Sequence, residues 1–278
     1  WNYPMQIIGR SVGAALAMGN AAVLKPAEEA CLTALAFAHI AQDAGLPDGA
    51  LNVVPGLGVE AGAALSGHAG VQHVSFTGSV KTGAAVQAAA ARNVVPVTLE
   101  LGGKSPQIVF DDADLDAALP FLVNAGIQNA GQTCSASSRI LVQKRVYEEV
   151  CTRMAAAYAD LTVGPALDDL RVGPLISARQ KDIVTAFLDK GHDLTIAATG
   201  SISDHAPETG AFVEPTLFVN VPADHPLARE EIFGPVQVII PFETEEDALK
   251  IANGTDYGLV ASIWTRDGAR QMRLAKAL

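Results

Sequence analysis

The sequence predicts an α/β protein, with a doubly wound parallel sheet in its first hundred residues and a second α/β domain after it. Short apolar runs typical of buried strands alternate with longer runs in which apolar residues recur at helical spacing. This alternation favours a parallel sheet, because each crossover helix lets the next strand run in the same direction. Gly102 and Gly103 interrupt the pattern, so we expect one domain over residues 1–102 and another over residues 103–278.

The composition narrows the class of protein. Hydrophobic residues make up 49% of the chain and charged residues 18%, which is enough to bury a core and is not typical of disorder. The net charge of −11 argues against nucleic-acid or anionic-membrane partners, and no apolar run reaches the length of a membrane span. The three cysteines lack metal-ligand spacing and the six histidines are scattered. We therefore expect a cytoplasmic protein without a metal site.

The first hundred residues are expected to alternate between strands and helices after an opening helix. Pro4 suits the first turn of that helix, and Gly19 suits its end. The expected strands are Ala21–Lys25, Leu51–Val54, Gln72–Phe76 and Val95–Leu101. The helices between them are expected from Glu28 to Ala44, onward from Gly58, and from Val80 to Arg92.

The second domain continues the alternation, with an exposed loop expected over residues 200–210. Its expected strands are Ile108–Phe110, Arg139–Gln143, Leu194–Ala198, Ala211–Val219, Val236–Pro241 and Leu259–Trp264. Its expected helices are Asp111–Asn129, Arg145–Asp160, Ser177–Lys190, Thr244–Asn253 and a last one from Asp267.

Two turns after strands are candidate nucleotide contacts. Gly56, Gly58 and Ala61 resemble a dinucleotide fingerprint, but no acidic residue occurs between Ala61 and Leu99 to meet the ribose. Glu28, which follows the first strand, is better placed for that role. The other turn, Gly78–Ser79, precedes a helix, so it suits either a phosphate site or a plain N-cap.

A thiol and a carboxylate each stand in an unusual local setting. Cys134 lies in a run of small polar and glycine residues after a helical pattern, and Glu100 interrupts an apolar strand. A loop cysteine and a carboxylate can serve as nucleophile and base. Cys31 and Cys151 lie in helical patterns and are expected to be packing residues.

Six motifs in order resemble the NAD(P)-dependent aldehyde dehydrogenase superfamily, and together they span essentially the whole chain. They are Trp1–Pro4, Leu24–Glu28, Phe76–Ser79, Thr98–Pro106, Gly131–Cys134 and Glu230–Pro235. The resemblance implies an enzyme that oxidises an aldehyde to a carboxylate with NAD, through a cysteine thiohemiacetal and thioester. NADP is left open, because Lys25 beside Glu28 could soften the repulsion of a 2′-phosphate.

The resemblance also implies roles for particular residues. Catalysis would rest on Cys134 as nucleophile, Glu100 as general base and Asn2 as an oxyanion-hole donor. The implied cofactor contacts are Lys25 and Glu28 at the adenosine ribose, Gly78 and Ser79 near the phosphates, and Glu231 and Phe233 at the nicotinamide ribose.

Rival interpretations remain at the level of the sequence. A CoA-acylating aldehyde dehydrogenase is disfavoured by Glu100, and a cofactor-free cysteine hydrolase leaves Lys25, Glu28 and Glu231 without a role. By resemblance the chain is expected to be a fragment, with an incomplete cofactor domain and a truncated catalytic domain. A homo-oligomer is expected for the full-length protein, and an inactive nucleotide-binding fragment is the alternative for this chain.

Overall fold

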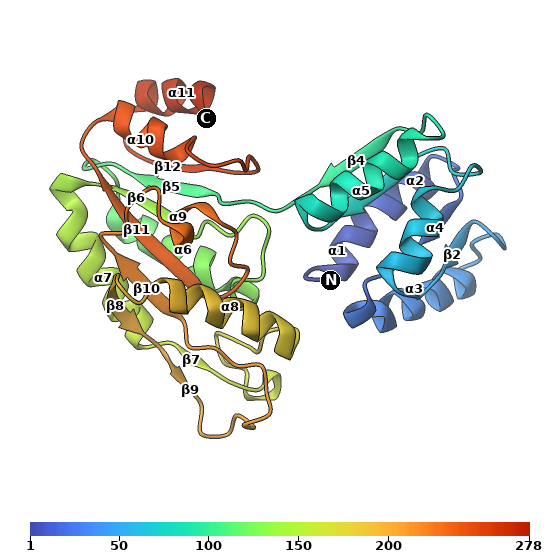
Figure 1. The fold of residues 1–278 in the computed structure, drawn as a ribbon, viewed down its shortest axis with the longest axis horizontal. Helices are drawn as coiled ribbons and strands as arrows, with labels where there is room; N and C mark the ends of the chain where they lie inside the picture. Colours follow the sequence, from blue (N-terminus) through green and yellow to red (C-terminus); the bar gives the residue numbers. More distant parts are fainter. The chain divides into compact units, whose positions relative to one another are not determined.

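The computed structural model describes residues 1–278, which form two compact units, Trp1–Leu101 and Gly102–Leu278 (Figure 1). Each unit is α/β, as the sequence predicts. That residues 1–102 form a cofactor domain and residues 103–278 a catalytic domain stays a prediction.

The first unit opens with one continuous helical stretch. It comprises α1 (Pro4–Ile8), a π-helical segment (Gly9–Gly13) and α2 (Ala14–Ala17). Pro4 occupies the first turn, where a missing N–H removes no helical hydrogen bond. This stretch carries Ile8 and Val12 into a small core with Ala34.

Two βαβ pairs follow. β1 (Ala22–Leu24) pairs in parallel with β2 (Leu51–Val53), and α3 (Cys31–Asp43) connects them after a 3₁₀ turn (Glu28–Ala30). β3 (Val74–Thr77) pairs in parallel with β4 (Val97–Glu100), and α5 (Val80–Ala91) connects them. A π-helical segment (Gly58–Gly62) and the short α4 (Ala63–Ser66) lie between the two pairs in the sequence.

The parallel direction confirms the prediction, but the strands form two separate two-stranded sheets and not one continuous sheet. The physical reason lies in the connections. Each pair is joined by one helix, which returns the chain directly beside the strand it left, and no hydrogen-bonded pairing joins one pair to the other.

The second unit contains a six-stranded sheet in the order β12-β5-β6-β11-β10-β8. All neighbouring strands are parallel except β8, which runs antiparallel to β10. In that order the strands are Ser262–Trp264, Pro106–Val109, Arg139–Gln143, Val236–Phe242, Thr216–Val219 and Thr195–Thr199.

Several segments differ from their expected structure; the expected strand Leu259–Trp264, for example, is shortened to β12. The expected strand Ala211–Val219 is shortened to β10, because Pro215 has no N–H to give to a ladder. The expected loop over residues 200–210 contains β9 (Ser201–Ile202), which pairs with β7 (Thr162–Val163). Backbone hydrogen bonds from Ser201 and Ser203 to the carbonyls of Leu161 and Val163 hold this pair.

Side chains that alternate along the strands fill a core on each face of the sheet. On β5, Val109 belongs to the larger core, while Ile108 belongs to the smaller one. The larger core includes residues of α6 (Leu115–Ile127), α7 (Tyr147–Ala159), α8 (Ala178–Lys190) and α9 (Pro226–Arg229). The smaller one includes residues of α10 (Glu245–Ala252) and α11 (Gly268–Ala277), the two red and orange helices of Figure 1.

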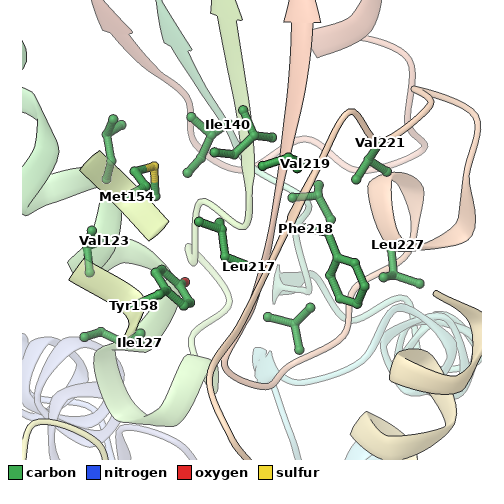
Figure 2. Close-up of a cluster of buried hydrophobic side chains, with 14 of the residues drawn as sticks. Val123, Ile127, Ile140, Met154, Tyr158, Leu217, Phe218, Val219, Val221 and Leu227 are labelled. Carbon is green, nitrogen blue, oxygen red and sulfur yellow. The ribbon is translucent and has the colours of Figure 1, made fainter. Parts of the chain in front are cut away.

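Figure 2 shows part of the larger core, in which side chains of α6 and α7 gather beside the sheet. Those labelled are Val123, Ile127, Ile140, Met154, Tyr158, Leu217, Phe218, Val219, Val221 and Leu227. Gln237 of β11 is a fully buried polar group in this region. Its amide accepts from the Tyr158 hydroxyl at 2.6 Å and donates to the carbonyls of Leu122 and Ser137 at 2.9 and 3.0 Å. Such a satisfied network avoids the cost of an unpaired buried amide.

We predict that Gly126→Ala destabilises the second unit by about 1–3 kcal/mol, the usual cost of overpacking. A Cβ at Gly126 would lie 2.1 Å from Cδ of Gln237, which is held on three sides. Urea unfolding measures the loss. The matched control is Gly268→Ala at the start of α11, where a Cβ meets nothing within 4 Å. Equal stability of the two variants would contradict the packing described here.

Candidate active site

The candidate site residues fall into two groups, one in each unit. Asn2, Lys25, Glu28, Gly78, Ser79 and Glu100 belong to the first unit, and Cys134, Glu231 and Phe233 belong to the second.

Lys25 and Glu28 lie together after β1. The Lys25 ammonium is 3.4 Å from the Glu28 carboxylate, and the Gly58 backbone N–H donates to Oε1 of Glu28 at 2.6 Å. The pKa of Glu28 is lowered, chiefly by backbone N–H donors and also by Lys25. The fingerprint-like turn therefore does contact an acidic residue, but that residue comes 30 positions before Gly58 and not after it. The sequence pattern alone gave no signal for this contact.

Gly78 and Ser79 lie between β3 and α5. The Ser79 hydroxyl accepts from the Thr82 backbone N–H at 3.3 Å and donates to the Thr82 hydroxyl at 3.0 Å, so Ser79 is an N-cap. Both residues are exposed, and Gly78 donates its N–H to the Glu100 carbonyl at 3.0 Å. The turn is thus fixed to the end of β4.

Glu100 is the last residue of β4, and its carboxylate contacts a residue that sequence reasoning missed. Nη1 of Arg10 lies 3.1 Å from Oε1 of Glu100. Arg10 comes from the helical stretch that begins two residues after Asn2. One feature of the sequence could have pointed to Arg10: it is the only charged side chain between Trp1 and Leu24.

In the second unit, Cys134 follows a turn with an uncommon backbone. Asn129, Ala130 and Gly131 all have positive φ, at 52°, 55° and 73°. Two of these are not glycine, and such a conformation persists only where surrounding contacts hold it. The Gln132 side chain supplies two such contacts. It donates to the Asn129 carbonyl at 2.9 Å and accepts from the Ile176 N–H at 2.8 Å. The result is a fixed loop that carries a half-buried Cys134 thiol.

Glycines allow the neighbouring backbones to approach this loop closely. A Cβ on Gly131 would lie 2.0 Å from the Gly234 carbonyl oxygen, and one on Gly103 would lie 2.7 Å from the Cys134 carbonyl oxygen. Any side chain at either position would displace the loop. Gly131, Gly103 and Gly234 also line one small crevice together with Thr133 and Glu231.

Glu231 and Phe233 border the same crevice. Oε1 of Glu231 accepts from the Gly103 N–H at 3.2 Å, and burial raises the pKa of this carboxyl. Phe233 has a φ of 57°, and its carbonyl accepts from the Gln180 side chain at 3.0 Å. Gly103 thus contacts both the backbone of Cys134 and the Glu231 carboxylate, and Phe233 lines the same crevice as Gly103 and Glu231.

Cys151 differs chemically from Cys134. It lies on α7 against the larger core, and burial raises the pKa of its thiol to about 11. Few molecules would carry a thiolate there near neutral pH, so Cys151 is unsuited to nucleophilic chemistry.

The chain belongs to the aldehyde dehydrogenase family, whose sequence pattern it matches over residues 1–278. It is 45% identical to a betaine aldehyde dehydrogenase of Cereibacter sphaeroides, over 100% of this chain and 57% of that protein. A crystal structure assigned to the aldehyde dehydrogenases, from Burkholderia cenocepacia, is 60% identical with a TM-score of 0.99, over 100% of this chain and 59% of that one. The NAD⁺ complex of an aldehyde dehydrogenase from Bacillus cereus is 40% identical with a TM-score of 0.95, over 100% and 57%.

The family and the α/β fold class are thus confirmed. The chain spans 54–59% of the length of relatives such as these, which is little more than half. None of its helices combines the length and the apolar character that crossing a membrane requires.

Lys104 is the strongest electrostatic anomaly near the candidate site. It follows Gly103, is 2% exposed, and its ammonium nitrogen has no hydrogen-bond partner. The pKa of Lys104 is lowered from 10.5 to about 7, chiefly by burial and also by the nearby Arg139, while Glu231 and Glu230 oppose the shift. Arg139, in contrast, donates to the carbonyls of Lys104, Ile251 and Ala252.

We predict that the stability of the 278-residue chain rises with pH between about 7 and 9 because of Lys104. In that window the unfolded chain keeps this proton and the folded chain releases it, so a single such group adds up to about 1.4 kcal/mol per pH unit. Lys104→Met is expected to stabilise the chain at pH 7 and to remove most of this dependence. The measurement is urea unfolding at pH 7, 8 and 9.

The control for this series is Lys276→Met, which removes an exposed lysine at the end of α11. It should leave the pH dependence as in the wild type. An unchanged slope in Lys104→Met would show that Lys104 is not a buried, proton-releasing group.

Proposed function

We propose that this chain forms part of an enzyme that oxidises an aldehyde to a carboxylate with NAD, through a covalent intermediate on Cys134. The family match supports this proposal, as do relatives named for aldehyde oxidation, including a betaine aldehyde dehydrogenase and a hydroxyisobutyraldehyde dehydrogenase. The expected partner is a small aldehyde. Assembly into a homo-oligomer stays a prediction for the whole protein.

The observation that carries the proposal is the loop that ends at Cys134. Three consecutive residues with positive φ precede the thiol, and glycine-only contacts at Gly103 and Gly131 hold the loop in place. Backbone strain of this kind is concentrated at functional sites, where it orients a reacting group. A cysteine that only packs in a core, such as Cys151, needs no strained loop to orient its thiol.

Each proposed catalytic residue supplies one group to the reaction. The Cys134 sulfur attacks the carbonyl carbon as a thiolate and forms a thiohemiacetal. The Asn2 amide donates a hydrogen bond to the oxyanion that this attack creates, which stabilises the developing charge. Loss of a hydride leaves a thioester, and Glu100 removes a proton from the water that hydrolyses it. The products are the carboxylate and the regenerated thiol.

The residues of the first unit fit a nicotinamide dinucleotide. When bound, this cofactor accepts the hydride. Lys25 and Glu28 can hold ribose hydroxyls, because one donates and the other accepts hydrogen bonds. The Glu28 carboxylate, whose lowered pKa keeps it ionised, repels a 2′-phosphate, so we propose NAD with NADP as the alternative. Gly78 and Ser79 are proposed for the phosphates, and Glu231 with Phe233 for the nicotinamide ribose.

No specific observation favours the CoA-acylating alternative. That chemistry has no need of a base that activates water, whereas Glu100 stands at a strand end with a solvent-accessible carboxylate.

We predict that Cys134→Ala abolishes NADH formation from aldehydes in the intact protein, with a fall of at least about 1000-fold in kcat, because the covalent route is lost. Cys151→Ala is the matched control, and it should keep activity, since that thiol lies against the core. Absorbance at 340 nm measures both variants, with circular dichroism as the check on folding. Turnover that survives in folded Cys134→Ala would refute the nucleophile assignment.

A further inference from the structure

A cavity of about 390 Å³ lies in the second unit, beside the starts of β5 and β6. Its polar lining includes Lys104, Ser105 and Arg139. It shares no lining residue with the crevice that Gly103 and Glu231 border, so it is a separate feature from the candidate active site. Its volume falls within the range of small-molecule sites, roughly 300–1,000 Å³.

Two polar side chains of this cavity have no partner inside the protein. Lys104 and Ser105 are each 2% exposed, and neither the ammonium nor the hydroxyl makes a hydrogen bond. Two other polar groups of the lining are satisfied: Arg139 donates to three backbone carbonyls, and the Asn253 amide donates to the Ala277 carbonyl at 2.9 Å. Since buried polar groups are normally paired, Lys104 and Ser105 are left to bind a group from outside the chain.

The lining also carries positive charge without a counter-ion. Arg139 is 1% exposed, and neither it nor Lys104 forms an ion pair with a carboxylate. The pKa of Arg139 is lowered to about 10, chiefly by burial and also by Arg229, and no carboxylate offsets the shift. Glu230 and Glu231 act on Lys104 only from beyond ion-pair distance. Because buried charges are normally paired, this cavity is suited to an anion.

The rest of the cavity wall is mainly apolar. Its lining residues include Leu259, Val260, Ala261 and Ile263, of which Leu259 and Val260 are 38% and 44% exposed. A ligand that covers these side chains removes apolar surface from water, which favours binding. An inorganic anion has no group for this wall, whereas an aliphatic chain has. The two parts of the lining therefore match a ligand with an anionic head and an apolar chain.

We infer that this cavity binds an aliphatic monocarboxylate, with its head at Lys104 and Ser105 and its chain along Leu259 and Ile263. The ammonium and the hydroxyl both donate hydrogen bonds, and an ionised carboxylate accepts them through its two oxygens. The head thus supplies the missing counter-ion. This assignment does not depend on the proposed function, because it requires neither a cofactor nor the Cys134 thiol.

The test is calorimetric titration of hexanoate into the 278-residue chain at pH 7. Hexanamide has the same length without the charge, and acetate has the charge with almost no chain. We expect hexanoate to bind at least about tenfold more tightly than either, because only hexanoate satisfies both parts of the lining. No detectable binding of hexanoate, or equal dissociation constants for hexanoate and either comparison ligand, would overturn the inference.

Three variants show whether hexanoate occupies this cavity. Lys104→Met keeps a long side chain without the ammonium, and it should weaken hexanoate binding at least about tenfold, the usual effect of losing a charged hydrogen bond. Ala261→Phe leaves both donors in place but adds a ring at the cavity wall, and it should weaken binding as well. The control Lys81→Met removes an exposed lysine of α5 and should bind hexanoate as the wild type does.

Circular dichroism checks that each variant is folded. Hexanoate binding within about threefold of the wild type in folded Lys104→Met would contradict the role of the ammonium and overturn the inference. Unchanged binding in folded Ala261→Phe would place the ligand outside the cavity and overturn it too.

Discussion

The arrangement of the second unit around Cys134 depends on close approaches that only glycine permits. Gly131 faces the Gly234 carbonyl, and Gly103 faces the Cys134 carbonyl, at distances that exclude any Cβ. Gly102 lies equally close to the Glu231 carboxylate. These contacts hold the turn before Cys134 in a conformation that non-glycine residues adopt rarely. The large core on the α6–α7 face of the sheet provides the rigid support against which such strain can persist.

In the first unit, the charged residues of the proposed site are held by ion pairs. Lys25 is paired with Glu28, and Arg10 with Glu100, so each of the two proposed functional carboxylates of the first unit already has a cationic partner. The Arg10–Glu100 pair is solvent-accessible, and such pairs contribute about 0–1 kcal/mol to stability, so this pair can open at little cost. A pair of this strength suits a carboxylate that must be released before it can act as a base.

Local pattern predicted most of the fold because helices and strands depend on periodicity and on breaks at glycine and proline. The alternation on β5 places Val109 in one core and Ile108 in the other, as a period of two requires. Strand pairing between distant segments has no such local signal, so the two separate β-pairs and the β7–β9 pair were not predictable. The same limit applies to Arg10, whose partner lies 90 positions later in the chain. Cys134 and Glu100 were identified through motifs, and their roles stay proposals.

The central claim is that Cys134 carries the acyl group during aldehyde oxidation. The most direct measurement is peptide mass spectrometry of the Glu100→Gln variant of the intact protein after incubation with an aldehyde and NAD. Without the base that activates water, the thioester should accumulate. The account predicts an acyl adduct on the peptide that contains Cys134, present only when NAD is added. Aldehyde oxidation without an adduct there, or an NAD-dependent adduct on Cys31 or Cys151, would contradict it.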